Sequence, residues 1–360
     1  MMLVINAGSS SVKFALFDAD LTQVLSGAVS EIGGKAELDI GGDRHPATAP
    51  DHADAMDLVL SSLAGRGHPV ESLTAAAHRV VHGGTAFSDS VRVTPEVIAA
   101  IEAQIPLAPL HNPHNVAPIR ALADRAPDLP QVAGFDTAFH TTLPEVALSY
   151  AIPADDRAAG LRRYGFHGIS YAGLVEALRA DGRLPPRLLA LHLGNGASVC
   201  AIRDGRSVAT SMGYSPTAGL TMGTRSGDID AMAVLDMARR HGIDATSARL
   251  NRKSGLLALG GASDMRALAA ANTPEADFAR AHFIHWAVAH AGSVIAQMGG
   301  LDALAFTGGI GENDTGIRDA IAGALSWIGP VPIHVVHAQE ERTLARDAAR
   351  ILAAARPEIS

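Results

Sequence analysis

One repeated pattern limits what this chain can fold into more than any other feature of its sequence. Residues 3–18 (LVINAGSSSVKFALFD) match residues 189–204 (LALHLGNGASVCAIRD), with Gly8 aligned on Gly194. Each copy reads as a strand, a glycine-rich turn, a second strand and an acidic turn, and because such hairpins are common, chance alone could produce one match. Two copies, each opening one half of the chain, instead predict duplicated α/β domains that face a shared ligand cleft.

The rest of the chain alternates between short β-branched runs and alanine-rich segments of helical period, which is typical of α/β folds with mixed sheets. The predicted strands are residues 3–6, 13–18, 24–30, 75–81, 131–136, 188–193, 198–204, 304–307 and 332–336, and the predicted helices include 51–64, 94–104, 171–180 and 276–298. Two prolines mark a seam at 141–156. We therefore expect a first domain at 1–140, completed by a C-terminal helix at about 341–360, and a second domain at 141–340.

Composition argues against several classes of protein. The 360 residues carry a formal charge of −8, which is unfavourable for a nucleic-acid-binding face. No apolar stretch approaches the length of a membrane-spanning helix, and the N-terminal residues MMLVINAG lack the basic start of a signal peptide. The single cysteine, Cys200, allows no internal disulfide. These features predict a soluble, cytoplasmic protein.

Three glycine-rich turns point to a nucleotide. The first, residues 6–13 (NAGSSSVK), offers phosphate oxygens its backbone N–H groups, the hydroxyls of Ser9 and Ser11 and the charge of Lys13. An ordinary polar hairpin with a solvated lysine has the same pattern, and the spacing is not that of a Walker A loop. The turns at 192–198 (HLGNGAS) and 306–313 (FTGGIGEN) would let a base, ribose or pyrophosphate approach the backbone closely. Three such turns spread over both halves favour a nucleotide.

Four charged or titratable residues lie in segments that look ordered. Arg79 ends an apolar strand and therefore needs an anionic partner, either a structural carboxylate or a ligand. Asp136 ends a buried-looking strand, where open α/β sheets place functional groups. Arg225 lies in a glycine-flanked turn, with a structural pair to Asp228 as the alternative, and His167 stands near glycines, with a capped turn as the alternative.

These residues and the nucleotide turns together predict phosphoryl transfer. The reaction needs cations and Mg²⁺ around the phosphoryl oxygens and little covalent chemistry from the protein. A zinc site is not expected, because there is no cysteine cluster and residues 111–114 (HNPH) are spaced for a turn rather than for one face of a helix.

A series of longer motifs runs in order through residues 2–313 and resumes at 339–341: NAGSSSVKFALFD, HRVVHGG, LAPLHNPHN, FDTAFH, YGFHGIS, HLGNGAS, MGYSPTAGLTMGTRSGDID, SGLLAL, SDMR, FTGGIGEN and QEE. This ordered set resembles the acetate and propionate kinase family. The resemblance implies the fold of acetate and sugar kinases, Hsp70 and actin, with two RNase-H-like domains around a nucleotide cleft. It also implies reversible in-line phosphoryl transfer between ATP and acetate, giving acetyl phosphate and ADP, with Mg²⁺ (or Mn²⁺) and a homodimer.

The resemblance assigns roles residue by residue. It implies that Asn6 and Glu340 hold Mg²⁺, that Arg79 binds the substrate carboxylate, and that Asp136 is the catalytic carboxylate. His167 and Arg225 match residues that stabilise the transition state. The methyl group of the substrate would lie among Val81, Leu110, Phe166 and Pro216. The implied nucleotide contacts are Lys13 with Ser9 and Ser11, then His192, Leu193, Gly194, Asn195, Gly196, Asp264, Met265, Arg266, Gly309, Ile310, Gly311, Glu312 and Asn313.

Asp136 is expected to orient an arginine or Mg²⁺-bound water rather than act as a base, because acetate is already deprotonated at pH 7. The chain departs from the family pattern in three places. Segment 314–338 is shorter than usual, and the usual Thr-Asn-Glu-Glu reads Ala-Gln-Glu-Glu at 338–341, which makes Glu341 an alternative metal ligand. Residues 261–263 (GAS) are about one residue short, which bears on the adenine contacts.

Acetate kinase is the leading hypothesis, and propionate kinase is close behind because one methylene changes binding by only about 1–3 kcal/mol. A non-catalytic ATP-binding module of the actin/Hsp70 type would explain the turns, but not the ordered motifs of Arg79, Asp136, His167 and Arg225. A degenerate kinase kept as a binding module is compatible with the short segment 314–338, and the retention of Asn6 and Glu340 argues against it.

Overall fold

The computed structural model describes residues 1–354 of the chain. Contacts within the chain define two compact units. Unit 1 contains Met1–Ala138, Gly168–Gly173 and the segment that begins at Gln339, and unit 2 contains Phe139–His167 and Leu174–Ala338. The C-terminal helix starts at Glu340 and is described to Ala354, so residues 355–360 of the predicted helix lie outside the described part of the chain.

Unit 1 is built on a mixed sheet of eight strands in the order β5-β4-β3-β2-β1-β6-β8-β7. β1 pairs antiparallel with β2 and parallel with β6, and β6 pairs parallel with β8. The strands are β1 (Met2–Ala7), β2 (Val12–Phe17), β3 (Gln23–Ser30), β4 (Glu37–Ile40), β5 (Asp43–Pro46), β6 (Ala75–Val80), β7 (Val91–Arg92) and β8 (Gln131–Phe135). The carboxyl ends of β1, β6 and β8 therefore lie side by side at one edge of the sheet.

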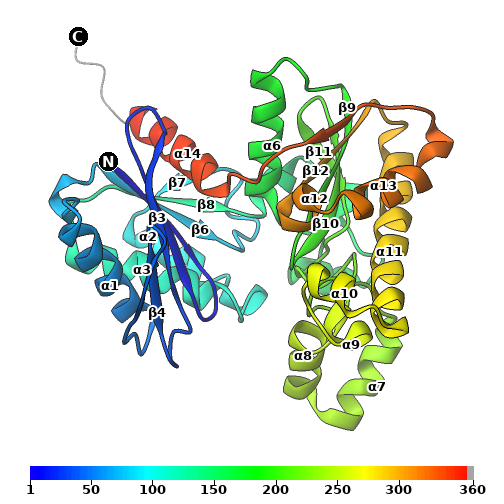
Figure 1. Ribbon diagram of the computed structural model, residues 1–360, viewed down its shortest axis with the longest axis horizontal. Helices are drawn as coiled ribbons and strands as arrows, with labels where there is room; N and C mark the ends of the chain where they lie inside the picture. Colours follow the sequence, from blue (N-terminus) through cyan, green and yellow to red (C-terminus); the bar gives the residue numbers. More distant parts are fainter. Residues whose placement is uncertain (355–360) are drawn as a thin grey trace. The chain divides into compact units, whose positions relative to one another are not determined.

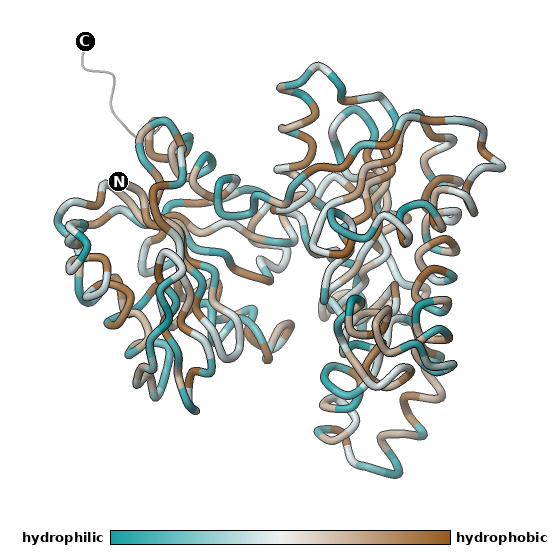
Figure 2. Tube along the Cα trace, viewed as in Figure 1, coloured by the Kyte–Doolittle hydropathy of each residue, from teal (hydrophilic) through white to brown (hydrophobic). Residues whose placement is uncertain are grey.

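Helices cover both faces of this sheet, which explains why β1 is apolar on both sides. One face packs on α1 (His52–Gly65) and α3 (Asn112–Arg125), and the other on α14 (Glu340–Ala354). Figure 1 shows these helices on opposite sides of the strands, and Figure 2 shows hydrophobic residues concentrated along the strands. The other helical elements of unit 1 are η1 (Val70–Ser72), α2 (Pro95–Glu102) and η2 (Ile105–Leu107).

Unit 2 has a second mixed sheet, in the order β11-β10-β9-β12-β13. Its strands are β9 (Arg187–Leu193), β10 (Ala197–Arg203), β11 (Arg206–Thr210), β12 (Ala303–Thr307) and β13 (Ile333–Val335). Its helices are α4 (Glu145–Leu148), α5 (Ala154–Ala158), α7 (Ala231–His241), α8 (Ile243–Arg252), α9 (Gly255–Gly260), α10 (Met265–Ala271), α11 (Pro274–Met298), α12 (Gly308–Asn313), α13 (Thr315–Ala324) and η4 (Ser326–Ile328). The elements η3 (Ala138–Thr142) and α6 (Gly168–Ala180) include residues of both units.

The repeated sequence pattern corresponds to a repeated strand arrangement. β1 and β9 each pair antiparallel with the strand that follows them, β2 and β10. Each also pairs parallel with a strand that returns later in the chain, β6 for β1 and β12 for β9. The predicted α/β fold with two mixed sheets is confirmed.

Several elements differ from the sequence prediction. The residues expected to form a turn at 111–114 instead lie at the start of α3, where Pro113 occupies the first turn, a place in which its missing N–H is not needed. Strands β4, β5, β7 and β11 were not expected, and β5 is fully exposed and polar, so it lacks the alternation that marks a strand. Within residues 1–354, no helix is both long and apolar enough to cross a bilayer.

Candidate active site

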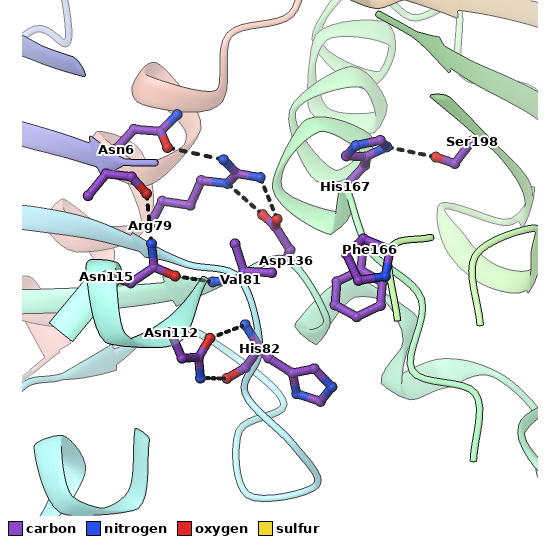
Figure 3. Close-up of polar contacts among 12 residues, drawn as sticks. Asn6, Arg79, Val81, His82, Asn112, Asn115, Asp136, Phe166, His167 and Ser198 are labelled. Carbon is purple, nitrogen blue, oxygen red and sulfur yellow. Dashed lines mark hydrogen bonds and ion pairs between the residues drawn. The ribbon is translucent and has the colours of Figure 1, made fainter. Parts of the chain in front are cut away.

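Arg79 and Asp136 form a bidentate ion pair at the carboxyl edge of the unit 1 sheet (Figure 3). Arg79 Nε donates to Asp136 Oδ1 at 3.0 Å, and Nη2 donates to Oδ2 at 2.6 Å. Nη1 donates to Asn6 Oδ1 at 3.1 Å. The three residues come from β6, the end of β8 and β1, whose parallel arrangement brings them together. The guanidinium is thus held at both ends by side chains of neighbouring strands.

The electrostatics of this cluster keep Arg79 charged. The Asp136 side chain is 3% exposed and that of Arg79 is 21% exposed. Burial acts to lower the pKa of Arg79, but the Asp136 carboxylate outweighs it, helped by Glu340 and Glu341, so the pKa is raised. Because both Asp136 oxygens accept from Arg79, the carboxylate is arranged to orient that guanidinium.

Two buried asparagines at the start of α3 support this edge, and sequence reasoning missed both. Asn115 Nδ2 donates to the Ala7 carbonyl at 2.8 Å, while its Oδ1 accepts from Val81 N at 3.0 Å. Asn112 binds both the N–H and the carbonyl of His82. Figure 3 shows both amides pointing into the backbone that follows Arg79. Their only sequence signal is the LAPLHNPHN motif, which predicts no role for either asparagine.

The first glycine-rich turn is tied down by backbone and by a histidine. Gly8 N donates to Ser11 O at 2.7 Å, and His52 Nε2 lies 2.7 Å from the Gly8 carbonyl oxygen. The Ser9 side chain is exposed and Ser11 is half-buried. Lys13 pairs with Asn6 across the β1–β2 ladder and lines a polar cavity of about 410 Å³ together with Glu341.

A second group of predicted residues gathers within unit 2 around His167. This residue precedes α6 in the left-handed region, with φ at +60°, a conformation that histidine adopts more readily than most side chains. Its Nδ1 lies 2.8 Å from Ser198 Oγ (Figure 3), and its ring stacks on His192 with centroids 4.1 Å apart. These contacts fix the plane of the imidazole and leave Nε2 facing away from Ser198.

Arg225 lies beside the same imidazole. A Cβ placed on Gly196 would lie 2.5 Å from Arg225 Nη2 and 3.0 Å from His167 Nε2, so both groups approach one stretch of backbone. Arg225 Nη1 also donates to the Pro216 carbonyl at 2.6 Å. Asp228, the alternative partner for Arg225, accepts from Gly219 N at 2.7 Å.

Behind this group, His140 supports the backbone next to His167. His140 Nε2 lies 2.9 Å from the Phe166 carbonyl oxygen, and its Nδ1 lies 2.8 Å from Ser207 Oγ. Burial lowers the pKa of His140 to about 4, so the ring is neutral at physiological pH. The FDTAFH motif thus contributes Asp136 to unit 1 and His140 to unit 2.

Three of the segments expected to contact nucleotide, 192–196, 264–266 and 309–313, contribute to one cavity of about 780 Å³ in unit 2, whereas the first glycine-rich turn lies in unit 1. This volume is typical of a site for a small organic ligand. The lining residues are Gly194, Asn195, Ser263, Asp264, Met265, Arg266, Gly309, Ile310, Asn313, Asp314 and Thr315. Ser263 belongs to the SDMR motif but has no role predicted for it, and Asp314 and Thr315 have no signal in the sequence.

The remaining predicted residues lie elsewhere. Leu193 and Gly311 are buried in the unit 2 core, and Glu312 turns its carboxylate to the backbone of Gly308 and Ala338. Among the apolar candidates, Val81 and Leu110 belong to unit 1, and Phe166 and Pro216 to unit 2.

The candidate metal ligands are both in unit 1. Asn6 is the penultimate residue of β1 and its amide oxygen accepts from Arg79, and Glu340 is the first residue of α14. Within residues 1–354, no group of three or more His, Cys, Asp or Glu side chains is arranged to hold a metal ion.

Comparison with known proteins identifies the family. The model of the acetokinase family matches residues 1–350. An acetate kinase of Deinococcus deserti is 44% identical over 396 aligned positions, covering 98% of each chain, and a propionate kinase of Citrobacter rodentium is 41% identical, covering 99% of this chain and 98% of the relative. The crystal structure of Porphyromonas gingivalis acetate kinase superposes with a TM-score of 0.90 at 35% identity, covering 98% of this chain and 99% of that one.

The likeness in sequence and in structure spans both units. It confirms the fold that the family resemblance implies, since the superposed structures are acetate and propionate kinases. The chain belongs to the acetokinase family, whose members transfer a phosphoryl group between ATP and acetate.

Proposed function

We propose that this protein is an acetate kinase that makes acetyl phosphate and ADP from acetate and ATP, and runs the reverse reaction. The observation that carries the proposal is Arg79, a charged side chain held at the edge of a buried sheet by Asp136 and Asn6. A module that only binds nucleotide has no need of such a group. A carboxylate substrate does, because guanidinium groups bind carboxylates through paired hydrogen bonds.

In the proposed reaction an acetate oxygen attacks the γ-phosphorus of ATP. A new oxygen–phosphorus bond forms while the bond between that phosphorus and the β–γ bridging oxygen breaks, and ADP leaves with the bonding electrons. No proton has to be removed from acetate at pH 7. Arg79 binds the acetate carboxylate, and Asp136 acts by orienting Arg79.

His167 and Arg225 are proposed to stabilise the charge on the phosphoryl oxygens during transfer. Ser198 and His192 hold the imidazole of His167, and its Nε2 lies on the side of Gly196 that Arg225 also approaches. Preorganised donors of this kind supply most of the catalysis in phosphoryl transfer, since little covalent chemistry is required. The nucleotide is assigned to the 780 Å³ cavity of unit 2.

We assign Mg²⁺, with Mn²⁺ as a substitute, to Asn6 and Glu340. Both offer hard oxygen donors, and the Asn6 amide oxygen, which accepts one bond from Arg79, has a second lone pair. Mg²⁺ in kinases is held by one or two protein oxygens together with water and phosphate, so two side chains suffice. When bound, the ion would neutralise charge on the nucleotide phosphates.

We propose acetate as the preferred acid and propionate as the second substrate, since the acetate kinase relative is 44% identical to the chain and the propionate kinase relative 41%. The methyl group is assigned to Val81, Leu110, Phe166 and Pro216. We also propose a homodimer, as the family resemblance implies, and a cytoplasmic location, because the single Cys200 leaves no internal disulfide to form.

The test is a hydroxamate assay for acyl phosphate with Mg-ATP and acetate, propionate or butyrate. Wild type should give product with acetate and propionate. Arg79→Ala should abolish it, and Asp136→Asn should lose most of kcat because Arg79 loses its charged partner. Arg120→Ala, which removes an arginine paired with Glu102 on the exposed side of α3, should behave as wild type.

Two results would count against the proposal. Absence of acyl phosphate with every acid, despite tight ATP binding, would favour a binding module. An Asp136→Asn variant that retained most of kcat would remove the essential role given to that carboxylate.

A further inference from the structure

The Glu312 carboxylate binds the backbone at both ends of segment 308–338, which starts within the third glycine-rich turn. Its Oε1 accepts from Gly308 N at 3.0 Å, at the start of α12, and from Ala338 N at 2.8 Å. Its Oε2 lies 2.7 Å from His337 Nδ1. The side chain is only 14% exposed, so these bonds compensate for the loss of water around a charged group.

The first of these bonds holds the turn that faces the cavity. Gly308 has φ at +79°, and a Cβ there would lie 2.7 Å from the Leu193 carbonyl oxygen, so the position requires glycine. Gly309 and Ile310, directly after it, line the cavity assigned to nucleotide, as does Asn313 at the end of α12. Glu312 is not among the residues that line the cavity, and its carboxylate accepts from the backbone N–H groups of Gly308 and Ala338.

The second bond holds the segment by which the chain leaves unit 2. β13 runs parallel to β12, and Val336 N donates to the Phe306 carbonyl at 2.9 Å. Ala338 is the last residue of unit 2, and Glu340, the candidate metal ligand, follows two residues later at the start of α14. A displacement of Ala338 would therefore be transmitted through two peptide units to Glu340.

We propose that Glu312 is a positioning residue that couples nucleotide binding to metal binding. It ties the cavity-lining turn to the segment that carries Glu340, so that ordering either one favours the other. The inference rests on the proposed function for the assignment of Glu340 to the metal. It differs from a direct nucleotide contact, because Glu312 acts through the backbone of Gly308 and Ala338.

The test measures ADP binding by titration calorimetry with and without Mg²⁺. The readout is the factor by which Mg²⁺ tightens ADP binding, a ratio that a general loss of folding would not lower selectively. Removing groups that orient metal ligands typically weakens metal binding by about 10- to 100-fold. In Glu312→Ala we expect the Mg²⁺ factor to fall about tenfold or more, with metal-free ADP affinity changed less than about threefold.

Two further variants sharpen the result. Glu340→Ala should also reduce the factor by which Mg²⁺ tightens ADP binding. The double variant, with Glu312→Ala and Glu340→Ala, should show a factor no smaller than that of Glu340→Ala alone, because both substitutions interrupt one pathway. Asp319→Ala, which removes an exposed acidic residue of α13, should keep the wild-type factor and controls for net charge. If Glu312→Ala proves too unstable to measure, Glu312→Gln keeps one acceptor oxygen and is expected to show a smaller loss of the same sign.

A wild-type Mg²⁺ factor in Glu312→Ala, or an equal loss of ADP binding with and without Mg²⁺, would overturn the inference. The second outcome would indicate a direct nucleotide contact. Additive losses in the double variant would also overturn it. Failure of the wild type to make acyl phosphate would instead count against the proposed function, while the calorimetric comparison could still be read.

Discussion

At the scale of single residues, Gly196 shows how an absent side chain shapes the site. The guanidinium of Arg225 and the imidazole of His167 occupy the space into which a Cβ would project. Their positions relative to the backbone of the second glycine-rich turn therefore depend on a hydrogen atom in place of a methyl group.

Gly196→Ala is accordingly expected to lower kcat about 100-fold, because a displacement of about 1 Å in positioned groups can have that effect. The hydroxamate assay with saturating acetate and Mg-ATP measures it. Gly323→Ala is the matched control, since nothing lies within 4 Å of a Cβ at that position in α13. A Gly196→Ala enzyme with wild-type kcat would show that Arg225 and His167 are not positioned through this backbone.

Residues of this kind divide into those that the sequence could identify and those that it could not. Arg79 and Asp136 could be identified because a charge at the end of an apolar strand is unusual. Their pairing could not, because they are 57 residues apart and only the parallel strands bring them together. Asn115 was missed because an amide in a segment rich in proline and histidine follows no period.

At the scale of secondary structure elements, α3 connects two strands that carry functional residues. Its first turn holds the backbone after β1 through the Ala7 carbonyl and the backbone after β6 through Val81 N. Asn6 directly precedes the first contact and Arg79 lies two residues before the second, so the start of α3 sets the spacing between the two strand ends.

Asn115→Ala is expected to lower the free energy of unfolding by about 2–4 kcal/mol, because it leaves two buried backbone groups without partners. It should also raise KM for acetate, since Arg79 is two residues from Val81. Urea denaturation and initial-rate kinetics measure the two effects. Arg120→Ala on the outer side of the same helix should change stability by less than about 1 kcal/mol, as exposed ion pairs contribute little. Equal stability of the two variants would contradict the connecting role of α3.

The elements themselves were predictable where their pattern was long and regular. The helix expected at 276–298 is α11, which begins two residues earlier at Pro274. The start of α3 was read as a turn because Pro113 and Pro118 interrupt its sequence, although both are accommodated in the helix. Strand β5 has no apolar face that a sequence pattern could reveal. Only its pairing with β4 holds it in the sheet, so the sequence does not predict it.

At the scale of the whole molecule, three buried histidines link stability to pH. Burial is the largest cause of the lowered pKa of His78, His82 and His140, each of which falls from 6.5 to about 4. Between these values the unfolded chain binds protons that the native protein does not bind. The contribution of these three neutral histidines to the free energy of unfolding is therefore fully present above about pH 6.5, and it is lost as the pH falls toward 4.

Each histidine should reduce stability by about 1 kcal/mol per pH unit within this window. Urea denaturation at pH 7.5, 6.5 and 5.5 should show a progressive loss, and His140→Gln should make that loss smaller even if the variant is less stable overall. His45→Gln, at an exposed position in β5, should leave the pH dependence unchanged. A flat stability profile between pH 6.5 and 5.5 would contradict the burial of these rings.

The packing of α14 has a consequence for how a ribosome can produce this protein. β1 is synthesised long before α14, yet one of its faces, with Met2 and Val4, packs on Leu344, Ala345 and Ala348 of that helix (Figure 1). During translation, more than 300 residues are added between β1 and α14, so that apolar surface stays uncovered until the helix emerges. Unit 2 lies almost wholly between these two segments, so it can finish folding first. Unit 1 is therefore completed only when α14 has emerged, and until then the apolar face of β1 lacks its covering helix, a condition that favours aggregation.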